Sequence, residues 1–118
     1  MKDQVSFVDF SKLDLRVGTI VKVETPEGSR TMYRLTVDLG PSFAEATEGK
    51  ERIIFAGIKE AYSPDELVGE QVVVVVNLEP KKIMGEESQG MLLAACETDD
   101  QPVVVVPKKQ VKNGSVVR

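Results

Sequence analysis

The sequence SPDELVGEQVVVVV at residues 63–76 combines the start of a helix with a buried strand. Ser63 can cap a first helical turn, Glu66 can complete a capping box, and Gly69 can end the helix after one or two turns. The continuous β-branched run at 72–76 is typical of a strand that is covered on both faces. We therefore expect a short helix that leads into the central strand of a closed or nearly closed barrel.

Two runs of alternating apolar and polar residues precede this segment and predict strands at 15–24 and 33–39. A turn at 25–29, which contains a proline and a glycine, separates them. Residues 51–56 predict a third strand. In the first run the alternation assigns to the buried face Leu15, Val17, Val21 and Val23, and to the opposite face Arg16, Gly18, Ile20, Lys22 and Glu24.

The remaining segments complete an all-β layout. Residues 42–49 are small, acidic and aperiodic, which predicts an exposed and mobile excursion, and residues 77–85 predict a loop. Further strands are expected at 91–96 and 103–106. Five strands with a short helix between the third and the fourth are the layout of an OB-fold, so we expect a five-stranded barrel with short terminal extensions.

Composition limits both the size and the chemistry of the protein. A chain of 118 residues suits one domain, so we expect a single OB-fold domain over residues 1–118. The chain has no histidine and one cysteine, Cys96, which excludes an internal disulfide, nearly every structural zinc site and histidine-based catalysis. No nucleophile and base pair is visible. We therefore expect no enzyme activity, no catalytic residue, no metal and no cofactor.

Charge and hydropathy restrict the partners. The sequence has no apolar run that could cross a bilayer and no signal-peptide layout at its start, so we expect a cytoplasmic protein without a membrane partner. Its net charge is −4, because 19 acidic residues outnumber 15 basic ones. Nucleic-acid binders usually carry a surplus of cations, so a role of that kind must depend on a local basic patch.

Four sequence blocks carry a resemblance to a known family. They are DFSKLDLRVG at 9–18, YSPDELVG at 62–69, NLEPKKIMG at 77–85 and ESQGMLLAA at 87–95. Together they resemble the tRNA-binding OB domain of methionyl-tRNA synthetase C-termini, of stand-alone tRNA-binding proteins and of the endothelial monocyte-activating polypeptide group. The similarity runs from about Phe7 to Arg118, and the last block is its most specific part.

One segment is more similar to a neighbouring branch of the same fold, the CsaA-type export chaperones. Residues 25–35, TPEGSRTMYRL, resemble that branch, whereas the tRNA-binding branch typically has a histidine and an Ala-Asp-Lys-Leu stretch there. The tripeptide Ala56-Gly57-Ile58 also departs from the usual Ser-Gly-Ile. The resemblance therefore implies a tRNA contact less clearly at the first turn than at the block around Ser88.

The expected binding surface is the open sheet face of the barrel and the loops beside it. Cations there could neutralise phosphates, amide and hydroxyl groups could bond to phosphate, 2′-hydroxyl or base edges, and a methionine could lie against a base or ribose. The predicted RNA-binding residues are Arg16, Lys22, Arg34, Arg52, Asn77, Lys81, Lys82, Ser88, Gln89 and Met91.

Each of these residues also has a simpler interpretation. Cations on an outward strand face commonly pair with acids across the sheet, such as Glu24 and Asp38. Asn77 could cap backbone groups, and Met91 could belong to the core. Aromatic rings such as Phe55 are core candidates first and stacking surfaces second.

Two functions from different classes follow. The resemblance implies a non-catalytic RNA-binding module that recognises the shape of folded tRNA, either free-standing or assisting an aminoacyl-tRNA synthetase. The alternative is an export chaperone of the CsaA type that binds unfolded polypeptide through an apolar groove including Met32, Ile83 and Met84. The Ser-Gln-Gly-Met order favours RNA, whereas the altered first turn and the acidic balance favour the chaperone.

We also expect a homodimer. The tail residues Val111, Val116 and Val117 have no evident place in a five-stranded barrel, and an unpaired β edge invites a second chain. Phe7 and Phe10 are equally hard to bury, and the resembling family commonly dimerises through its ends. The alternative is a monomer whose tail folds back on its own barrel.

Overall fold

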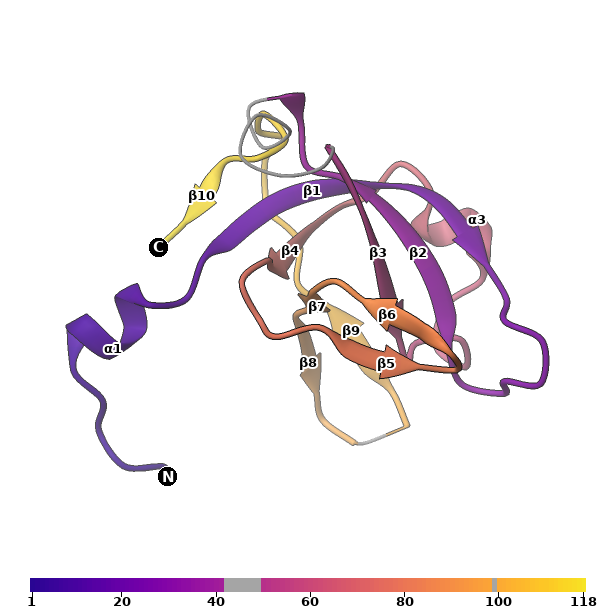
Figure 1. Ribbon diagram of the computed structural model, residues 1–118, viewed down its shortest axis with the longest axis horizontal. Coiled ribbons are helices and arrows are strands. Elements are labelled where there is room, and N and C mark those ends of the chain that lie inside the picture. Colours follow the sequence, from indigo (N-terminus) through magenta and orange to yellow (C-terminus); the bar gives the residue numbers. More distant parts are fainter. Residues whose placement is uncertain (42–49, 99) are drawn as a thin grey trace.

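The computed structural model describes residues 1–41, 50–98 and 100–118 and shows a barrel built from one curved antiparallel sheet (Figure 1). The excursion expected at 42–49 lies outside the described residues. The elements in chain order are α1 (Phe7–Ser11), β1 (Leu15–Glu24), β2 (Tyr33–Asp38), β3 (Glu51–Ala56), α3 (Pro64–Leu67), β4 (Gln71–Val75), β5 (Lys81–Ile83), β6 (Glu86–Ser88), β7 (Met91–Leu92), β8 (Ala94–Cys96), β9 (Pro102–Val104) and β10 (Val116–Val117).

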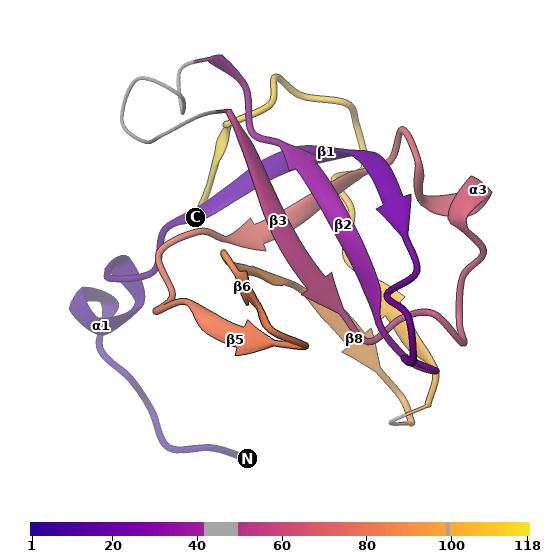
Figure 2. The same cartoon turned by 45° about the vertical axis from the view of Figure 1, so that its right-hand side comes forward.

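The main sheet has the strand order β3-β2-β1-β4-β7, and β10 adds to β1. The first half of the long strand β1 pairs with β4, and its second half pairs with β2. Figure 2 shows these strands crossing around a common interior, with α3 between β3 and β4 in the chain and the β5–β6 hairpin beside β3. The predicted all-β OB-type barrel with a short helix after the third strand is confirmed.

The central strand is covered on both faces, as its valine run predicts. Val72 and Val74 lie in the main core with Ile20, Leu35 and other apolar residues of β1 to β4. Val73 and Val75 form a second cluster with Leu15, and Leu93 and Val117 pack against it. Alternate residues of β4 therefore stabilise two separate apolar layers, and the second layer depends on the C-terminal tail.

The start of α3 has the expected local chemistry. Glu66 accepts a hydrogen bond from the backbone N–H of Ser63 at 2.8 Å, which completes the capping box with Pro64 in the first turn. Leu67 is fully buried and anchors this short helix on the barrel. Among the described residues, no helix is long and apolar enough to cross a membrane.

The face assignment of the first strand was wrong in its middle. Ile20, expected to face outward, is completely buried, and Val21, expected to face inward, is 42% exposed. Ile20 lies opposite Val37 and Lys22 lies opposite the adjacent Thr36, so Val21 is an additional residue in a β-bulge. Because the bulge shifts the alternation by one residue, Ile20 before it and Val23 after it both pack in the main core, and the inward assignment of Val23 was correct.

The predictions for residues 91–96 and 77–85 differ from the structure. The expected single strand is two strands, and the expected loop contains a strand. The first splits into β7, which pairs with β4, and β8, which pairs with β9. The second contains β5, which pairs with β6 in a hairpin. Met84 and Gly85 at its tip both have positive φ, at 52° and 85°, as a two-residue type I′ turn requires.

The two ends of the chain behave differently. The C-terminal tail belongs to the main sheet, because Val116 and Val117 pair with Arg16 and Leu15 of β1. The expected lack of partners for the tail was therefore wrong, because the tail folds back on its own barrel. Helix α1 instead stands apart from the barrel in both ribbon views, and Phe7 is 79% exposed on it (Figures 1 and 2).

Candidate nucleic-acid interface

An open cavity of about 600 Å³ lies between the barrel and the β5–β6 hairpin. Its size falls within the range of roughly 300–1,000 Å³ that is usual for small-ligand sites. It brings together four of the predicted residues, Asn77, Lys81, Ser88 and Met91. The complete lining is Phe55, Asn77, Leu78, Glu79, Lys81, Ile83, Ser88, Gly90 and Met91.

The hairpin register determines which lysine faces this cavity. Lys81 lies opposite Ser88, and Lys82 lies opposite Glu87. Because side chains alternate along a strand, Lys81 and Ile83 share the face that lines the cavity, whereas Lys82 points to the other face. Both lysines are exposed. Within the described part of the chain, no carboxylate lies at ion-pair distance from either of them.

Arg34 ties the hairpin to the barrel. Its guanidinium donates two hydrogen bonds of 2.8 Å to the carboxylate of Glu86 on β6 and a third to Glu24 on β1. The hydrogen bond from Arg34 holds the pKa of the Glu86 carboxyl below its ordinary value, and the same bond raises the pKa of Arg34. The structural interpretation of Arg34 as a partner of acids is therefore correct, and its charge is largely balanced within the protein.

The other predicted cations on the strands also have partners inside the chain. Arg16 donates to the Asp14 carboxylate at 2.6 Å and to the Gly114 carbonyl at 3.2 Å. Arg52 donates to the carbonyl of Gln89 at 2.9 Å. Lys22 lies 3.8 Å from a carboxylate oxygen of Glu24, an exposed pair of little energetic weight. None of these cations lines the cavity.

Two predicted polar residues, Asn77 and Gln89, hold the loops around the cavity in place. Asn77 accepts a hydrogen bond from the Asp14 N–H at 2.8 Å and donates one to the Lys12 carbonyl at 2.6 Å. Gln89 accepts one from the Ile53 N–H at 2.9 Å. The capping interpretation of Asn77 is thus correct.

Ser88 is the most enclosed of the predicted residues. It is only 4% exposed, and its hydroxyl accepts a hydrogen bond from the Phe55 N–H at 3.0 Å. The same hydroxyl donates to the Gly90 carbonyl at 3.3 Å. Ser88 therefore joins β6 to β3, which places the hairpin over the cavity. An RNA contact through this hydroxyl stays a prediction.

The apolar part of the site was recognised only in part, because the sequence suggested Ile83 for a peptide groove and Met91 for RNA but gave Leu78 no role. Phe55, Leu78 and Ile83 line the cavity together with Met91, which is 47% exposed on β7. The positions of Lys81 and Ile83, two residues apart, could have indicated that they share one face of a strand. This pattern covers only three residues, which is too short to predict a strand. Residues 77–85 had been interpreted as a loop, where no face is defined.

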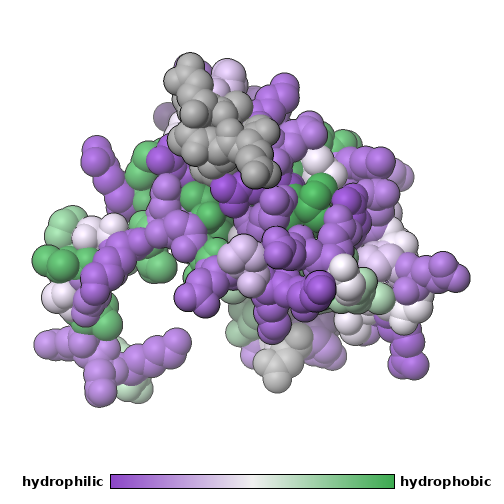
Figure 3. Space-filling model, viewed as in Figure 1, coloured by the Kyte–Doolittle hydropathy of each residue, from purple (hydrophilic) through white to green (hydrophobic). Residues whose placement is uncertain are grey.

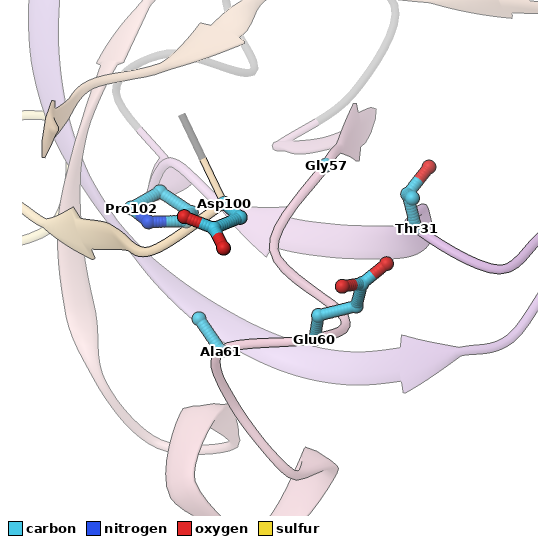
Figure 4. A pocket seen from close by; sticks show the side chains of 6 residues that line it. All are labelled: Thr31, Gly57, Glu60, Ala61, Asp100 and Pro102. Carbon is cyan, nitrogen blue, oxygen red and sulfur yellow. The ribbon is translucent and has the colours of Figure 1, made fainter. Parts of the chain in front are cut away.

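A second cavity, of about 350 Å³ (Figure 4), is lined by two acidic residues, whereas the first has one basic and one acidic lining residue, Lys81 and Glu79. Glu60 comes from the segment after β3 and Asp100 from the turn before β9, and both carboxylates belong to its lining. Two carboxylates repel phosphate. The cavity beside Lys81 is therefore the better candidate for a nucleic-acid contact.

Comparison with known proteins identifies the family of the chain. The family described as "Putative tRNA binding domain" matches residues 15–116. Methionine–tRNA ligase of Methanococcoides burtonii is 43% identical over 98% of this chain, and that of Pyrococcus furiosus is 46% identical over 97%. The chain spans only 16% and 14% of the length of these two relatives.

Solved structures show the same barrel in both branches of the family. A methionyl-tRNA synthetase-related protein from Pyrococcus horikoshii has a TM-score of 0.85 at 34% identity, with 99% of this chain and 100% of that chain covered. The chaperone CsaA from Bacillus anthracis has a TM-score of 0.84 at 29% identity, with 98% and 100% covered. The resemblance inferred from the four sequence blocks is confirmed, and the chain belongs to the tRNA-binding domain family, related to the C-terminal regions of methionyl-tRNA synthetases.

Proposed function

We propose that this chain is a single non-catalytic domain that recognises the shape of folded tRNA in the cytoplasm, by phosphate and 2′-hydroxyl contacts around the β5–β6 hairpin. The observation that carries the proposal is the exposed ammonium group of Lys81 at an open cavity in a domain of the tRNA-binding family. Because the net charge is −4, binding depends on this local cation rather than on overall attraction. Of the predicted residues, Lys81 and Met91 make direct contacts, and Asn77, Ser88 and Gln89 hold the site.

The hairpin offers a matched pair of variants to test this site. Lys81→Ala is expected to weaken binding of bulk tRNA and to reduce the slope of log K against log salt by about one, because one phosphate contact is lost. Lys82→Ala removes the same charge from the opposite face of the strand, so its effect is expected to be less than half as large. Filter binding at a series of salt concentrations measures both. Equal effects of the two variants would contradict a contact on the cavity side.

The relatives suggest how such a domain is used. In them, the matching region occupies about a sixth of a methionine–tRNA ligase. We propose that this domain supplies tRNA affinity to an aminoacyl-tRNA synthetase, as part of the same chain or as a separate partner. A synthetase assay with and without the domain, at tRNA concentrations from well below to well above KM, is expected to show a lower KM for tRNA with the domain and an unchanged kcat.

The chaperone function is the second candidate. The CsaA structures match this chain at TM-scores of 0.84 and 0.82, and Met84 at the hairpin tip is exposed beside an apolar cavity. An unfolded polypeptide added as competitor in the tRNA binding assay distinguishes the two. We expect tRNA to remain bound. Displacement of tRNA by the polypeptide at equal concentration would favour the chaperone.

We propose that the homodimer forms through α1 rather than through the tail. Phe7 and Val8 are exposed on this helix, Val5 precedes it, and the Phe7 and Phe10 rings lie 6.5 Å apart (centroid to centroid) as one apolar surface. Figure 3 shows apolar side chains gathered on this arm. A second copy of the same surface would cover it and leave the barrel free for RNA.

Light scattering tests this interface. The chain of 12.9 kDa is expected to have twice that mass at micromolar concentration and to become monomeric when Phe7 and Phe10 are both replaced by serine. Replacement of Val116 by serine is the control, because Val116 is exposed on β10, which already pairs with its own β1. A mass near 12.9 kDa for the unchanged chain would exclude the dimer.

A further inference from the structure

The walls of the hairpin cavity are mainly apolar and come from four separate segments. Phe55 of β3 lies at the base and is almost completely buried, whereas Leu78, Ile83 and Met91 surround it with more exposed side chains. Their positions are held by the Ser88 hydrogen bond to β3 and by the Arg34 ion pair to the hairpin. These contacts fix the hairpin wall of the cavity to the barrel, so the cavity is already formed.

The uncharged polar side chains in this lining make hydrogen bonds within the chain. The amide of Asn77 bonds to Asp14 and Lys12, and the hydroxyl of Ser88 bonds to Phe55 and Gly90. The Ser88 hydroxyl is enclosed, and Asn77 uses one of its two amide N–H groups and one of its two acceptor positions, so a ligand meets few uncharged side-chain partners in the cavity. Such a site holds a ligand mainly by packing against its surface rather than by hydrogen bonds to a base edge.

The charges in the lining identify the class of ligand. Lys81 and Glu79 are both lining residues, and Lys81 has no carboxylate at ion-pair distance among the residues described. An apolar cavity next to an available ammonium group fits a flat base joined to a phosphate. A base inside a duplex cannot enter, because both of its faces are stacked and its edge is paired.

We infer that this cavity receives one unpaired nucleobase of the bound RNA, with Lys81 on its phosphate, and does so without selecting among the four bases. The inference rests on the proposed tRNA-binding function and adds to it the kind of nucleotide that the site takes. The base packs between Met91 and the Leu78 and Ile83 side chains, since a methionine sulfur contacts aromatic rings favourably. Packing of this kind accepts every base because each has a π face.

Short RNAs that differ by a single nucleotide test the inference. The probes are a fully paired RNA duplex and the same duplex with one bulged nucleotide, made with A, C, G or U at the bulge. The 118-residue chain is expected to bind the bulged duplexes about tenfold more tightly than the paired duplex, in line with the usual contribution of one stacked base. The four bulged duplexes are expected to agree within about threefold, since their edges are not read.

Two methionines on the hairpin side of the barrel provide matched variants. Met91 lines the cavity and is 47% exposed, whereas Met84 is 52% exposed at the hairpin tip and is not part of the lining. Met91→Ala is expected to weaken binding of the bulged duplex about threefold to tenfold and to leave the paired duplex unchanged. Met84→Ala is expected to alter neither. Leu78→Ala is a second cavity variant, in case Met91→Ala lowers the melting temperature through its strand pairing with Val75.

Several results would overturn the inference. Equal binding of bulged and paired duplexes would do so, as would a preference of more than about tenfold for one base, which requires an edge contact. Competition by an unfolded polypeptide that disappears in Met91→Ala would assign the cavity to a peptide side chain instead. Bulk tRNA is measured in parallel: salt-dependent tRNA binding without a bulge preference would reject only the base cavity, whereas no tRNA binding at all would reject the proposed function itself.

Discussion

Replacement of Gly114 by alanine is expected to lower the free energy of unfolding by about 2–5 kcal/mol, the sum of a left-handed backbone penalty and an overpacked contact. Gly114 has a φ of 90°, and a Cβ atom there would lie 2.6 Å from the carbonyl oxygen of Leu39. The Gly114 N–H also donates to the Val17 carbonyl at 2.7 Å. The close approach is backbone against backbone, so no side-chain movement can relieve it.

Displacement of the tail at Gly114 would also destabilise the second apolar layer of the barrel. Residues after Gly114 form β10, and Val117 covers the cluster of Leu15, Val73 and Val75. A displaced tail would expose that cluster to water and remove the hydrogen bond from the Val17 N–H to the Ser115 carbonyl. Thermal or denaturant unfolding measures the stability, and hydrogen exchange at the Val17 amide reports on the tail.

Gly69 provides the matched control. Its φ of 92° is nearly the same, but a Cβ atom there would meet nothing within 4 Å. Gly69→Ala is therefore expected to cost only the backbone penalty, about 1–2 kcal/mol. The difference between the two variants isolates the contact with Leu39. If both variants lost the same stability, the close approach of the tail to the barrel would be refuted.

Ser88→Ala is expected to destabilise the fold by about 1–3 kcal/mol, because the buried N–H of Phe55 loses its acceptor. The sequence had suggested the reverse, a direct RNA contact whose loss would leave the melting temperature nearly unaltered. Both hydrogen-bonding directions of the hydroxyl are now assigned to Phe55 and Gly90. Affinity for tRNA per folded molecule is therefore expected to stay within about twofold, because the hydroxyl is enclosed and both of its hydrogen-bonding directions are used within the chain.

Ser11→Ala serves as the comparison for this variant. The Ser11 hydroxyl makes an exposed local contact to the Val8 carbonyl at 2.7 Å, and its removal is expected to change stability by less than about 0.5 kcal/mol. Unfolding curves and tRNA titrations of both variants are compared. Unchanged stability with clearly weaker tRNA binding for Ser88→Ala would restore the direct contact that the sequence suggested.

Features that depend on neighbouring residues could be predicted from the sequence. The capping box of Ser63 and Glu66 involves residues three apart, and the burial of both faces of β4 follows from the composition of the valine run. The family assignment depends on the order of residues within four short blocks, and it was correct. These signals are contained in the sequence itself, because each requires only a local backbone geometry or a local pattern.

Features that depend on residues far apart in the chain could not be predicted from the sequence. The bulge at Val21 arises from the register of β1 against β2, and the fold-back of Val116 and Val117 depends on an edge of β1 about a hundred residues away. The same holds for the site, where Arg34 is neutralised by Glu86, and Ser88 is held by Phe55. The sequence determined the barrel and the family, because local patterns specify strands and motifs. Only the tertiary structure decided which cations remain available to RNA, because an ion pair depends on which surfaces the folded strands bring together.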